Sequence, residues 1–399
     1  MVDQEEILSV VREIMSKFSY FTGLTSKNAS RRYLWTDAFA VCNFLELYHR
    51  TGENQYKKLA FHLVDQVHHI LGQHREDDQR TGWISGLSAL EGEKHPTEGG
   101  LRIGKELNER EIGEPLDMRL EWDRDGQYYH YLTKWMRALN RMSQVTGDLT
   151  FNRWAIELAK TAHNAFTYVS PFGEKSMYWK MSIDLSRPLV SSMGQHDPLD
   201  GFIIYNQLQA TALKAQEPLD LKKEIADMVR ICERKDWTTY DPLGIGSLLC
   251  NAYEVAQLVF NGYWKKNTLI IDLLKSSKLG LEGYLKRKPM QLPSDCRLGF
   301  RELGLSLGLH AIESLQEMIT KKPDLFDNKK DLFSLIDNLL NYVPLIQKIE
   351  EFWINPAIRQ TNSWIEHIDI NMVMLATTLI PDGYLGSKFV SRDYLDYKT

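Results

Sequence analysis

Residue types that transfer protons recur where several predicted helices begin. Each of these helix starts combines acidic, imidazole or guanidinium side chains with aromatic rings; the segments are 31–37, 121–130, 194–202, 240–242, 297–302 and 362–367. Two carboxyl groups in one place can act as general acid and general base, which glycosidic cleavage usually requires. Aromatic rings stack on the C–H faces of sugars, and charged groups bond to sugar hydroxyls. The mixture therefore indicates a site that binds and processes a carbohydrate.

The segment 194–202 carries the strongest candidates. Asp197 and Asp200 are three residues apart with Pro198 between them, so both project from one helix start towards the same space. Gly201 permits the close approach of a ligand or of another backbone. We therefore predict that Asp197 and Asp200 are catalytic residues.

Two further carboxylates, Asp123 and Asp125, precede the predicted helix at 126–146 and are also predicted to be catalytic. Any one of these aspartates could instead cap a helix, because aspartate is a preferred N-cap residue. Asp241-Pro242 fits that structural role better, since proline is favoured at the first helical position.

Substrate contacts are predicted for other side chains at the same helix starts: Arg32, Trp35, Asp37, Tyr129, His130, His196, Arg301, Trp364 and His367. The one aspartate in this set lies one turn inside an otherwise apolar helix, where a lone charge is costly without a partner or an aqueous cavity. Trp35 and Trp364 could instead be core residues. Arg301 could instead form an ion pair with Glu302 or Glu366.

The elements that position these residues are helices joined in pairs. Apolar residues recur at three- and four-residue spacing over most of the chain, which is the helix period. Gly52 and Gly147 each end a predicted helix in a left-handed cap, an acidic residue follows, and the next helix starts. An aromatic residue and an alanine stand at matching offsets after each glycine: Tyr56 and Ala60, and Phe151 and Ala155. This similarity indicates an internal repeat of a helical hairpin.

The pattern predicts about six hairpins. An opening helix at 5–19 is followed by the pairs 33–49 with 55–74, 126–146 with 151–168, 201–215 with 221–233, 243–263 with 268–286, and 298–319 with 329–346, and a last helix spans 363–379. A ring of inner helices surrounded by outer helices buries all the apolar faces economically, which predicts an all-α fold, an (α/α)6 toroid in one domain over residues 1–399. The long connections 74–125 and 168–200 are expected at the mouth of that ring.

Composition narrows the class of protein. The 399 residues include 48 Lys+Arg and 53 Asp+Glu, a net charge of −5, which argues against binding to nucleic acid or to an anionic membrane surface. The acidic N-terminus does not resemble a signal peptide, and the four scattered cysteines indicate reduced thiols in a cytoplasmic protein. We expect no cofactor and no metal site, a small carbohydrate substrate, and a monomer or homodimer.

At this level of detail the chain resembles the six-hairpin glycosidase-like superfamily, and within it the unsaturated glucuronyl hydrolases. That family has an Asp-His-Asp-x-Gly-Phe stretch at the start of an inner helix, and its counterpart here is the segment from Asp197 to Phe202. The first aspartate matches Asp197, and the second has no counterpart in register. The resemblance implies that Asp197 donates a proton and acts as base towards water, with Asp123 or Asp125 as the second carboxylate.

The sequence therefore predicts a glycoside hydrolase that acts on a small, acidic or unsaturated oligosaccharide. Two other functions remain open. The chain also resembles acylglucosamine 2-epimerases through its Arg-x-x-Trp start, Arg32 to Trp35. That chemistry abstracts a proton beside a carbonyl with paired histidines, and His196 and His367 would have to serve here. The third possibility is a carbohydrate-binding toroid without catalytic activity.

Overall fold

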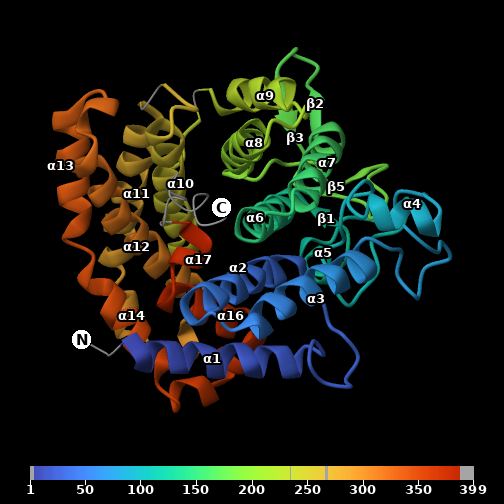
Figure 1. Ribbon diagram of the computed structural model, residues 1–399, viewed down its shortest axis with the longest axis horizontal. Helices are drawn as coiled ribbons and strands as arrows, with labels where there is room; N and C mark the ends of the chain where they lie inside the picture. Colours follow the sequence, from blue (N-terminus) through green and yellow to red (C-terminus); the bar gives the residue numbers. More distant parts are fainter. Residues whose placement is uncertain (1–3, 234, 266–267, 387–399) are drawn as a thin grey trace, which may run out of the picture. The chain divides into compact units, whose positions relative to one another are not determined.

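Most of the chain is α-helical. The computed structural model describes residues 4–233, 235–265 and 268–386, and within them α-helices greatly outnumber short strands (Figure 1). The chain divides into two compact units. The first comprises Met1–Ser16, His49–Gly52 and Trp237–Thr399, and the second comprises Lys17–Tyr48 and Glu53–Asp236. The predicted all-α class is confirmed, and the single domain over residues 1–399 stays a prediction.

The second unit contains three of the predicted helix pairs. Its helices are α2 (Leu34–Thr51, up to Tyr48 in this unit), α3 (Asn54–Leu71), α4 (Ala89–Lys94), α5 (Met118–Asp123), α6 (Tyr129–Thr146), α7 (Thr150–Phe166), α8 (Asp197–Lys214) and α9 (Lys222–Cys232). Short turns join α2 to α3 and α6 to α7, and α6 packs against both α7 and α8. The second unit thus has the helical hairpins that the apolar periodicity predicts.

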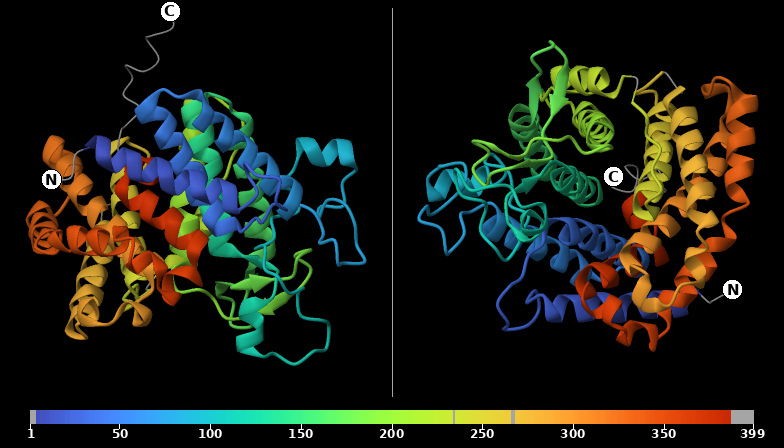
Figure 2. Two further views of the ribbon diagram at one scale, coloured as in Figure 1. Left: turned by 90° about the horizontal axis from the view of Figure 1, so that it is seen from below. Right: turned by 180° about the vertical axis from the view of Figure 1, so that it is seen from behind.

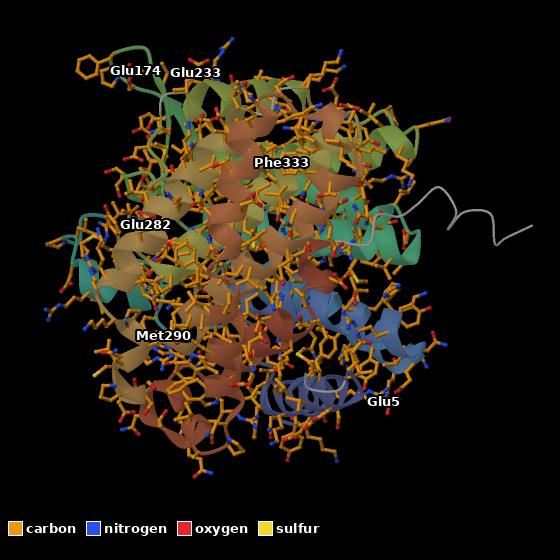
Figure 3. All side chains as sticks on the ribbon, turned by 90° about the vertical axis from the view of Figure 1, so that its left-hand side faces the viewer. Glu5, Glu174, Glu233, Glu282, Met290 and Phe333 are labelled. Atoms are coloured by element: carbon orange, nitrogen blue, oxygen red, sulfur yellow. The ribbon has the colours of Figure 1, made fainter. Side chains whose placement is uncertain are left out.

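The first unit contains the remaining pairs. It includes the start of α1 (Gln4–Phe21), and then α10 (Pro242–Phe260), α11 (Thr268–Lys286), α12 (Gly299–Lys321), α13 (Lys329–Leu340), α14 (Pro344–Ile354), α15 (Asn362–Ile365), α16 (Ile368–Leu379) and α17 (Asp382–Leu385). Four 3-10 turns lie between them: η1 (Pro289–Gln291), η2 (Ser294–Cys296), η3 (Pro323–Leu325) and η4 (Ile358–Gln360). Figure 3 shows all described side chains from the side on which Phe333 of α13 lies.

The repeat inferred from the two glycine turns is present in the structure. Gly52 has a φ of 71° and Gly147 a φ of 75°, so both occupy the left-handed region in which a side chain would be strained. The aromatic residue and the alanine that follow each turn are all buried: Tyr56, Ala60, Phe151 and Ala155. The matching offsets therefore mark equivalent packing positions in the two hairpins.

Two predicted helices are divided. The predicted helix at 329–346 ends at Leu340, and Pro344 opens the separate helix α14, because proline has no N–H to continue a helix but fits its first turn. The predicted helix at 363–379 is split into α15 and α16 at Glu366 and His367.

The long connection 168–200 contains short strands that the sequence analysis did not predict. Strands β1 (Gln127–Tyr128), β4 (Lys180–Met181) and β5 (Pro188–Val190) form an antiparallel sheet in that order, and β2 (Thr167–Val169) pairs with β3 (Lys175–Met177). Tyr128 of β1 pairs with Lys180 of β4. Figure 2 shows strands β4 and β5, in light green, near the teal segment that carries α5. The β1–β4 pairing ties the loop to the start of α6.

Helix α10 is long and apolar enough to cross a membrane by length and composition alone. However, 72% of its apolar window is buried inside the protein. Burial of that extent is typical of a core helix, and α10 packs against α11 and α12 within the first unit.

Candidate functional site

Two of the predicted catalytic carboxylates lie at the start of α8. Asp197 is the first residue of this helix, Pro198 follows it, and the Asp197 side chain is only 6% exposed. Asp200 lies one turn later, and its Oδ2 is 3.0 Å from Nζ of Lys134 on α6. The two aspartates are therefore neighbours, as predicted, but Asp200 has a buried cation as its partner.

The start of α6 brings an imidazole to the same place. Helix α6 begins directly after β1, which puts His130 in its first turn. His130 Nδ1 lies 3.8 Å from Oδ1 of Asp197. His130 Nδ1 and Asp197 Oδ2 are both buried and have no hydrogen-bond partner. The imidazole is 28% exposed, so its accessible part lies away from Nδ1. We call His130 and Asp197 the acid–base pair.

Burial sets the protonation states of this pair. Desolvation, with the negative charge of Asp200 as a second cause, raises the pKa of Asp197 to about 8. Desolvation lowers the pKa of His130 to about 4. Near pH 7 the pair is therefore a carboxylic acid beside a neutral imidazole. One group can donate a proton while the other accepts one.

Aromatic rings lie around His130. The His130 ring lies edge-on to Tyr131 with centroids 4.7 Å apart, and 5.3 Å from the ring of Tyr128. It is parallel to the indole of Trp179, with an interplanar angle of 8° and a centroid distance of 6.4 Å. Trp122 packs edge-on against Trp179 at 5.0 Å. Sequence reasoning missed Trp179 because its position depends on the pairing of β4 with β1.

Asp125 does not have the environment of a catalytic group, contrary to the prediction. Its carboxylate is fully buried, 2.6 Å from Arg102 and 3.3 Å from Arg75, and it accepts hydrogen bonds from the amides of Gly104 and Gly126. With both oxygens occupied in this way, Asp125 fixes the connection 74–125 to the chain before β1. Asp123 is exposed on α5, and within the described part of the chain no hydrogen bond or ion pair joins it to the acid–base pair.

The predicted substrate-binding residues near the start of α2 also have internal partners. Arg32 and Asp37 form a buried ion pair at 3.4 Å, and Asp37 accepts the amide hydrogen of Tyr33 at the helix start. Trp35 is buried and packs against Phe39. Arg32, Trp35 and Asp37 thus stabilise the start of α2, which corrects the prediction that they contact substrate.

Tyr129, the other predicted substrate-binding residue on α6, is a core residue. Tyr129 is fully buried and donates a hydrogen bond from its hydroxyl to Tyr205 of α8 at 2.8 Å. Tyr129 therefore joins α6 to α8 behind the acid–base pair, which corrects its predicted role in substrate binding. His196 is half-buried at the N-cap of α8, beside Asp197.

Three candidates belong to the first unit. Arg301 forms an ion pair with Asp241 rather than with a glutamate. Asp241 also caps α10 through the amide of Gly244 at 3.0 Å, the structural role expected for it. Trp364 is buried and stacks on Trp353, which corrects its predicted role in substrate binding. His367 is exposed at the N-cap of α16. Substrate contact by His367 and His196 stays a prediction.

One group of possible metal ligands is found among residues 4–233, 235–265 and 268–386. His95, Glu98 and Glu157 offer three ligand atoms within 4.8 Å of one another, on the surface of the second unit. His95 Nδ1 is 2.7 Å from a carboxylate oxygen of Glu157. These groups are separate from the acid–base pair in sequence and in contacts. Within the described part of the chain, no disulfide involves any of the four cysteines: Cys42, Cys232, Cys250 and Cys296.

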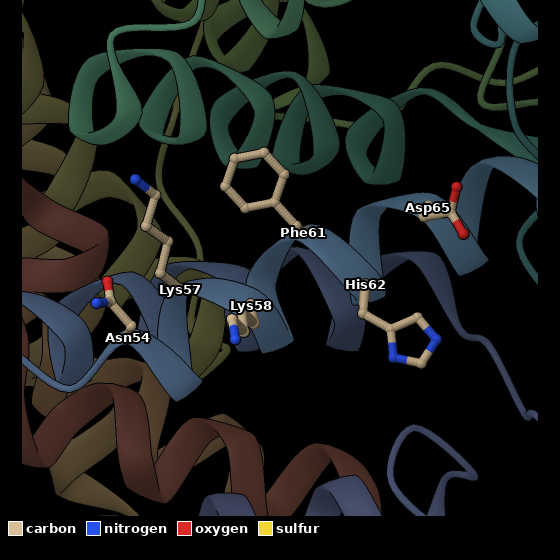
Figure 4. A pocket seen from close by; sticks show the side chains of 6 residues that line it. All are labelled: Asn54, Lys57, Lys58, Phe61, His62 and Asp65. Atoms are coloured by element: carbon tan, nitrogen blue, oxygen red, sulfur yellow. The ribbon is translucent and has the colours of Figure 1, made fainter.

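Two surface hollows are each lined by a single helix. One lies on α3, and Figure 4 shows that its neighbours Phe61 and His62 point to opposite sides of the helix. The other lies on α13 around Phe333. Side chains that diverge from one helix do not converge on a reacting atom, so neither hollow matches the start of α8 as a candidate site.

Comparisons with known proteins give matches among solved structures alone. No family model matches the chain, and no curated protein matches its sequence. A cellobiose 2-epimerase from Spirochaeta thermophila DSM 6192 is 12% identical, with 78% of this chain and 74% of that chain covered and a TM-score of 0.45. A cellobiose 2-epimerase from Bacillus thermoamylovorans B4167 is 10% identical, with coverage of 79% and 76% and a TM-score of 0.43.

A D-mannose isomerase structure is 14% identical, with 83% of this chain and 86% of that chain covered and a TM-score of 0.46. All three likenesses are structural, at 10 to 14% sequence identity. The finer resemblance to unsaturated glucuronyl hydrolases stays a prediction.

Proposed function

We propose that this chain is a sugar isomerase or epimerase that moves a proton at the carbon next to a carbonyl group, with His130 as base and Asp197 as acid. The observation that carries the proposal is the acid–base pair: a buried carboxylic acid 3.8 Å from a neutral imidazole, each with an unpartnered polar atom. Proton transfer next to a carbonyl needs one group that accepts and one that donates at the same pH.

The reaction balances on these two groups. The imidazole of His130 takes the proton from the carbon, and Asp197 gives its proton to the carbonyl oxygen, which leaves a neutral enediol. In an isomerase, the neighbouring hydroxyl then returns a proton to Asp197, and the imidazolium of His130 protonates the other carbon. In an epimerase, the enediol hydroxyl that Asp197 formed returns its proton to Asp197, and the first carbon must regain its proton on the opposite face. Between the two steps, the imidazolium and the carboxylate form an ion pair, which stabilises both charges in a buried site.

The aromatic surroundings support a sugar as the substrate. Tyr128, Tyr131 and Trp179 present rings around His130, and sugar C–H faces stack on such rings. Lys134 supports the assignment of roles, because it compensates the charge of Asp200. Asp200 is thus engaged by Lys134, and Asp197 is the carboxyl group next to His130.

The test is isotope exchange in deuterated water. Incubation of aldoses, ketoses and N-acetyl sugars should place deuterium on the carbon next to the carbonyl, and the rate should fall at least about 100-fold in His130→Gln and in Asp197→Asn. Asp123→Asn is the matched control, because it removes an exposed carboxylate that does not touch the pair. Exchange that persists in both variants of the pair would remove it from the mechanism.

Glycoside hydrolysis is the second candidate, and the raised pKa of Asp197 favours it, because protonation of a leaving-group oxygen needs a neutral carboxylic acid. Hydrolysis also needs a carboxylate that activates water, and Asp200 is held by Lys134. Release of a chromophore from aryl glycosides or cleavage of unsaturated uronides, lost in Asp197→Asn without any exchange at carbon, would select hydrolysis instead.

A further inference from the structure

An exposed tryptophan, Trp122, is linked to His130 through one intervening aromatic ring. Trp122 on α5 is 50% exposed, although tryptophan is a residue that proteins bury on average. Its ring lies edge-on to Trp179, with centroids 5.0 Å apart, and 6.4 Å from the ring of Tyr128. Trp179 in turn lies 5.1 Å from Tyr128 and parallel to His130. The rings therefore form a continuous series that runs from His130 to Trp122.

A buried lysine fixes this series of rings. Lys180 follows Trp179 in the chain and has no exposed surface. Its ammonium group lies 2.8 Å from the carboxylate of Glu121 and donates to the backbone carbonyls of Glu121 and Arg124 at 2.7 and 2.9 Å. These contacts hold the backbone on both sides of Trp122. The exposed indole is thus held by its ring contacts and by an anchored backbone.

We propose that Trp122 stacks on a second sugar unit, so that the substrate is a disaccharide or longer glycoside rather than a free monosaccharide. The inference rests on the proposed function, with the first sugar unit at His130 and Asp197. Trp122 contacts Trp179, and Trp179 is the ring parallel to His130, so Trp122 lies one aromatic ring further from the reacting group. A fixed aromatic face at that position contributes binding energy through contacts with the C–H groups of a sugar, and it does so without specific hydrogen bonds.

The same helix offers a matched control. Met118 and Leu120 of α5 are 47% and 37% exposed, and neither takes part in the ring series. A protein partner that covers this apolar surface would contact all three side chains. A sugar that stacks on an aromatic ring needs Trp122 alone. The effects of the three substitutions therefore separate the two kinds of ligand.

The experiment is calorimetric titration of the full chain with cellobiose, lactose and maltose, and with glucose and mannose as single-ring probes. Trp122→Ala should weaken the binding of at least one disaccharide about fivefold or more and leave monosaccharide binding unchanged. Met118→Ala and Leu120→Ala should leave both unchanged. Equal losses for both kinds of sugar, no loss for either, or no binding of any disaccharide would overturn the proposal.

A binding measurement separates this proposal from the proposed reaction. His130→Gln and Asp197→Asn should abolish isotope exchange and still bind the disaccharide in a Trp122-dependent way. If exchange never occurs but that dependence holds, the second-sugar site stands and the proton-transfer function fails. If exchange occurs on monosaccharides with kcat/KM as high as on any disaccharide, and Trp122→Ala changes neither, the second-sugar site fails alone. Self-association that disappears in all three α5 variants would assign the surface to a protein contact instead.

Discussion

The Nδ1 atom of His130 lies 3.8 Å from Oδ1 of Asp197, and each residue stands in the first turn of its own helix. The unpaired N–H groups of a helix start favour negative charge and disfavour positive charge. This field opposes the imidazolium form of His130, and it stabilises the carboxylate that Asp197 becomes when it gives up a proton. The two helix starts therefore support the acceptor and donor roles proposed for the pair.

We expect a bell-shaped pH dependence of kcat/KM. The rate should rise as His130 loses its proton around pH 4, and it should fall as Asp197 ionises around pH 8. The ordinary pKa values would instead place the histidine limb above pH 6 and give no carboxyl limb on the alkaline side. Initial rates measured from pH 3.5 to 9.5 on the substrate found by isotope exchange check this profile.

The variants assign the two limbs of that profile. Asp197→Asn should remove the alkaline limb from whatever activity remains, and His130→Gln should remove the acidic limb. Asp123→Asn should keep both limbs. An alkaline limb that is unchanged in Asp197→Asn would show that a different group carries the second proton.

Asp197 should also make the protein less stable as pH rises. Its pKa is raised from 3.8 to about 8 in the folded chain, so unfolding releases a proton between these values. The free energy of unfolding then falls by about 1.4 kcal/mol per pH unit over this window, as far as Asp197 alone determines it. Asp197→Asn removes this dependence. The variant should therefore become progressively more stable than the natural chain between pH 5 and pH 8.

Urea unfolding at pH 5, 6.5 and 8 checks this prediction. The stability difference between Asp197→Asn and the natural chain should widen with pH, and a difference independent of pH would contradict the raised pKa. Asp200→Asn is the contrasting variant. It removes the carboxylate that lies 3.0 Å from the buried ammonium of Lys134, so we expect it to destabilise the protein at every pH.

Local sequence rules pointed to part of the candidate site. Helix-start positions brought Asp197, Asp200 and His130 to attention, and the two aspartates and the histidine lie together in the structure. The glycine caps at Gly52 and Gly147 were also predictable, because a left-handed turn strains any residue with a side chain. These features depend on residues that are close together in the sequence, and residue spacing reveals relationships of that local kind.

The remaining features depend on contacts between distant segments. Asp125 has the same sequence environment as a catalytic aspartate, but Arg102, 23 residues before it, occupies its carboxylate. The sequence did not identify Lys134 as part of the candidate site, because its partner Asp200 lies on another helix. Trp179 reaches His130 only through the short pairing of β4 with β1. Residue spacing cannot reveal which charge finds a partner across such distances.

Gly194 should be needed for the position of the Asp197 carboxyl group. A Cβ atom at Gly194 would overlap all three atoms of that carboxyl group. We expect Gly194→Ala to move the carboxyl group from His130 and lower kcat by at least about tenfold, because displacement of a reacting group by an ångström is costly. Ser192→Ala, in the same exposed loop, is the control. Retention of full kcat, with the alanine incorporated and the fold intact by circular dichroism, would contradict the geometry around Asp197.

His310 in the first unit should stabilise the fold in its protonated form. Burial alone lowers the pKa of His310, but hydrogen bonds to Glu313 and Glu350 outweigh burial and raise it to about 9. A histidine with a raised pKa contributes its full stabilisation below its unfolded value of about 6.5, and this contribution is lost as pH rises through 9. We expect His310→Gln to destabilise the protein by up to about 3 kcal/mol at pH 6 and by much less at pH 10.

Glu350 is the partner that makes this effect large. Its Oε1 atom is 3.0 Å from His310 and also accepts hydrogen bonds from Ser306 and Thr378, so the carboxylate stays in place when the imidazole is removed. Glu313 is 47% exposed, and Glu313→Gln should therefore have a much smaller effect than His310→Gln at either pH. Urea unfolding of the three proteins at pH 6 and pH 10 measures both differences. Equal destabilisation of His310→Gln at the two pH values would show that the histidine acts through packing rather than through its charge.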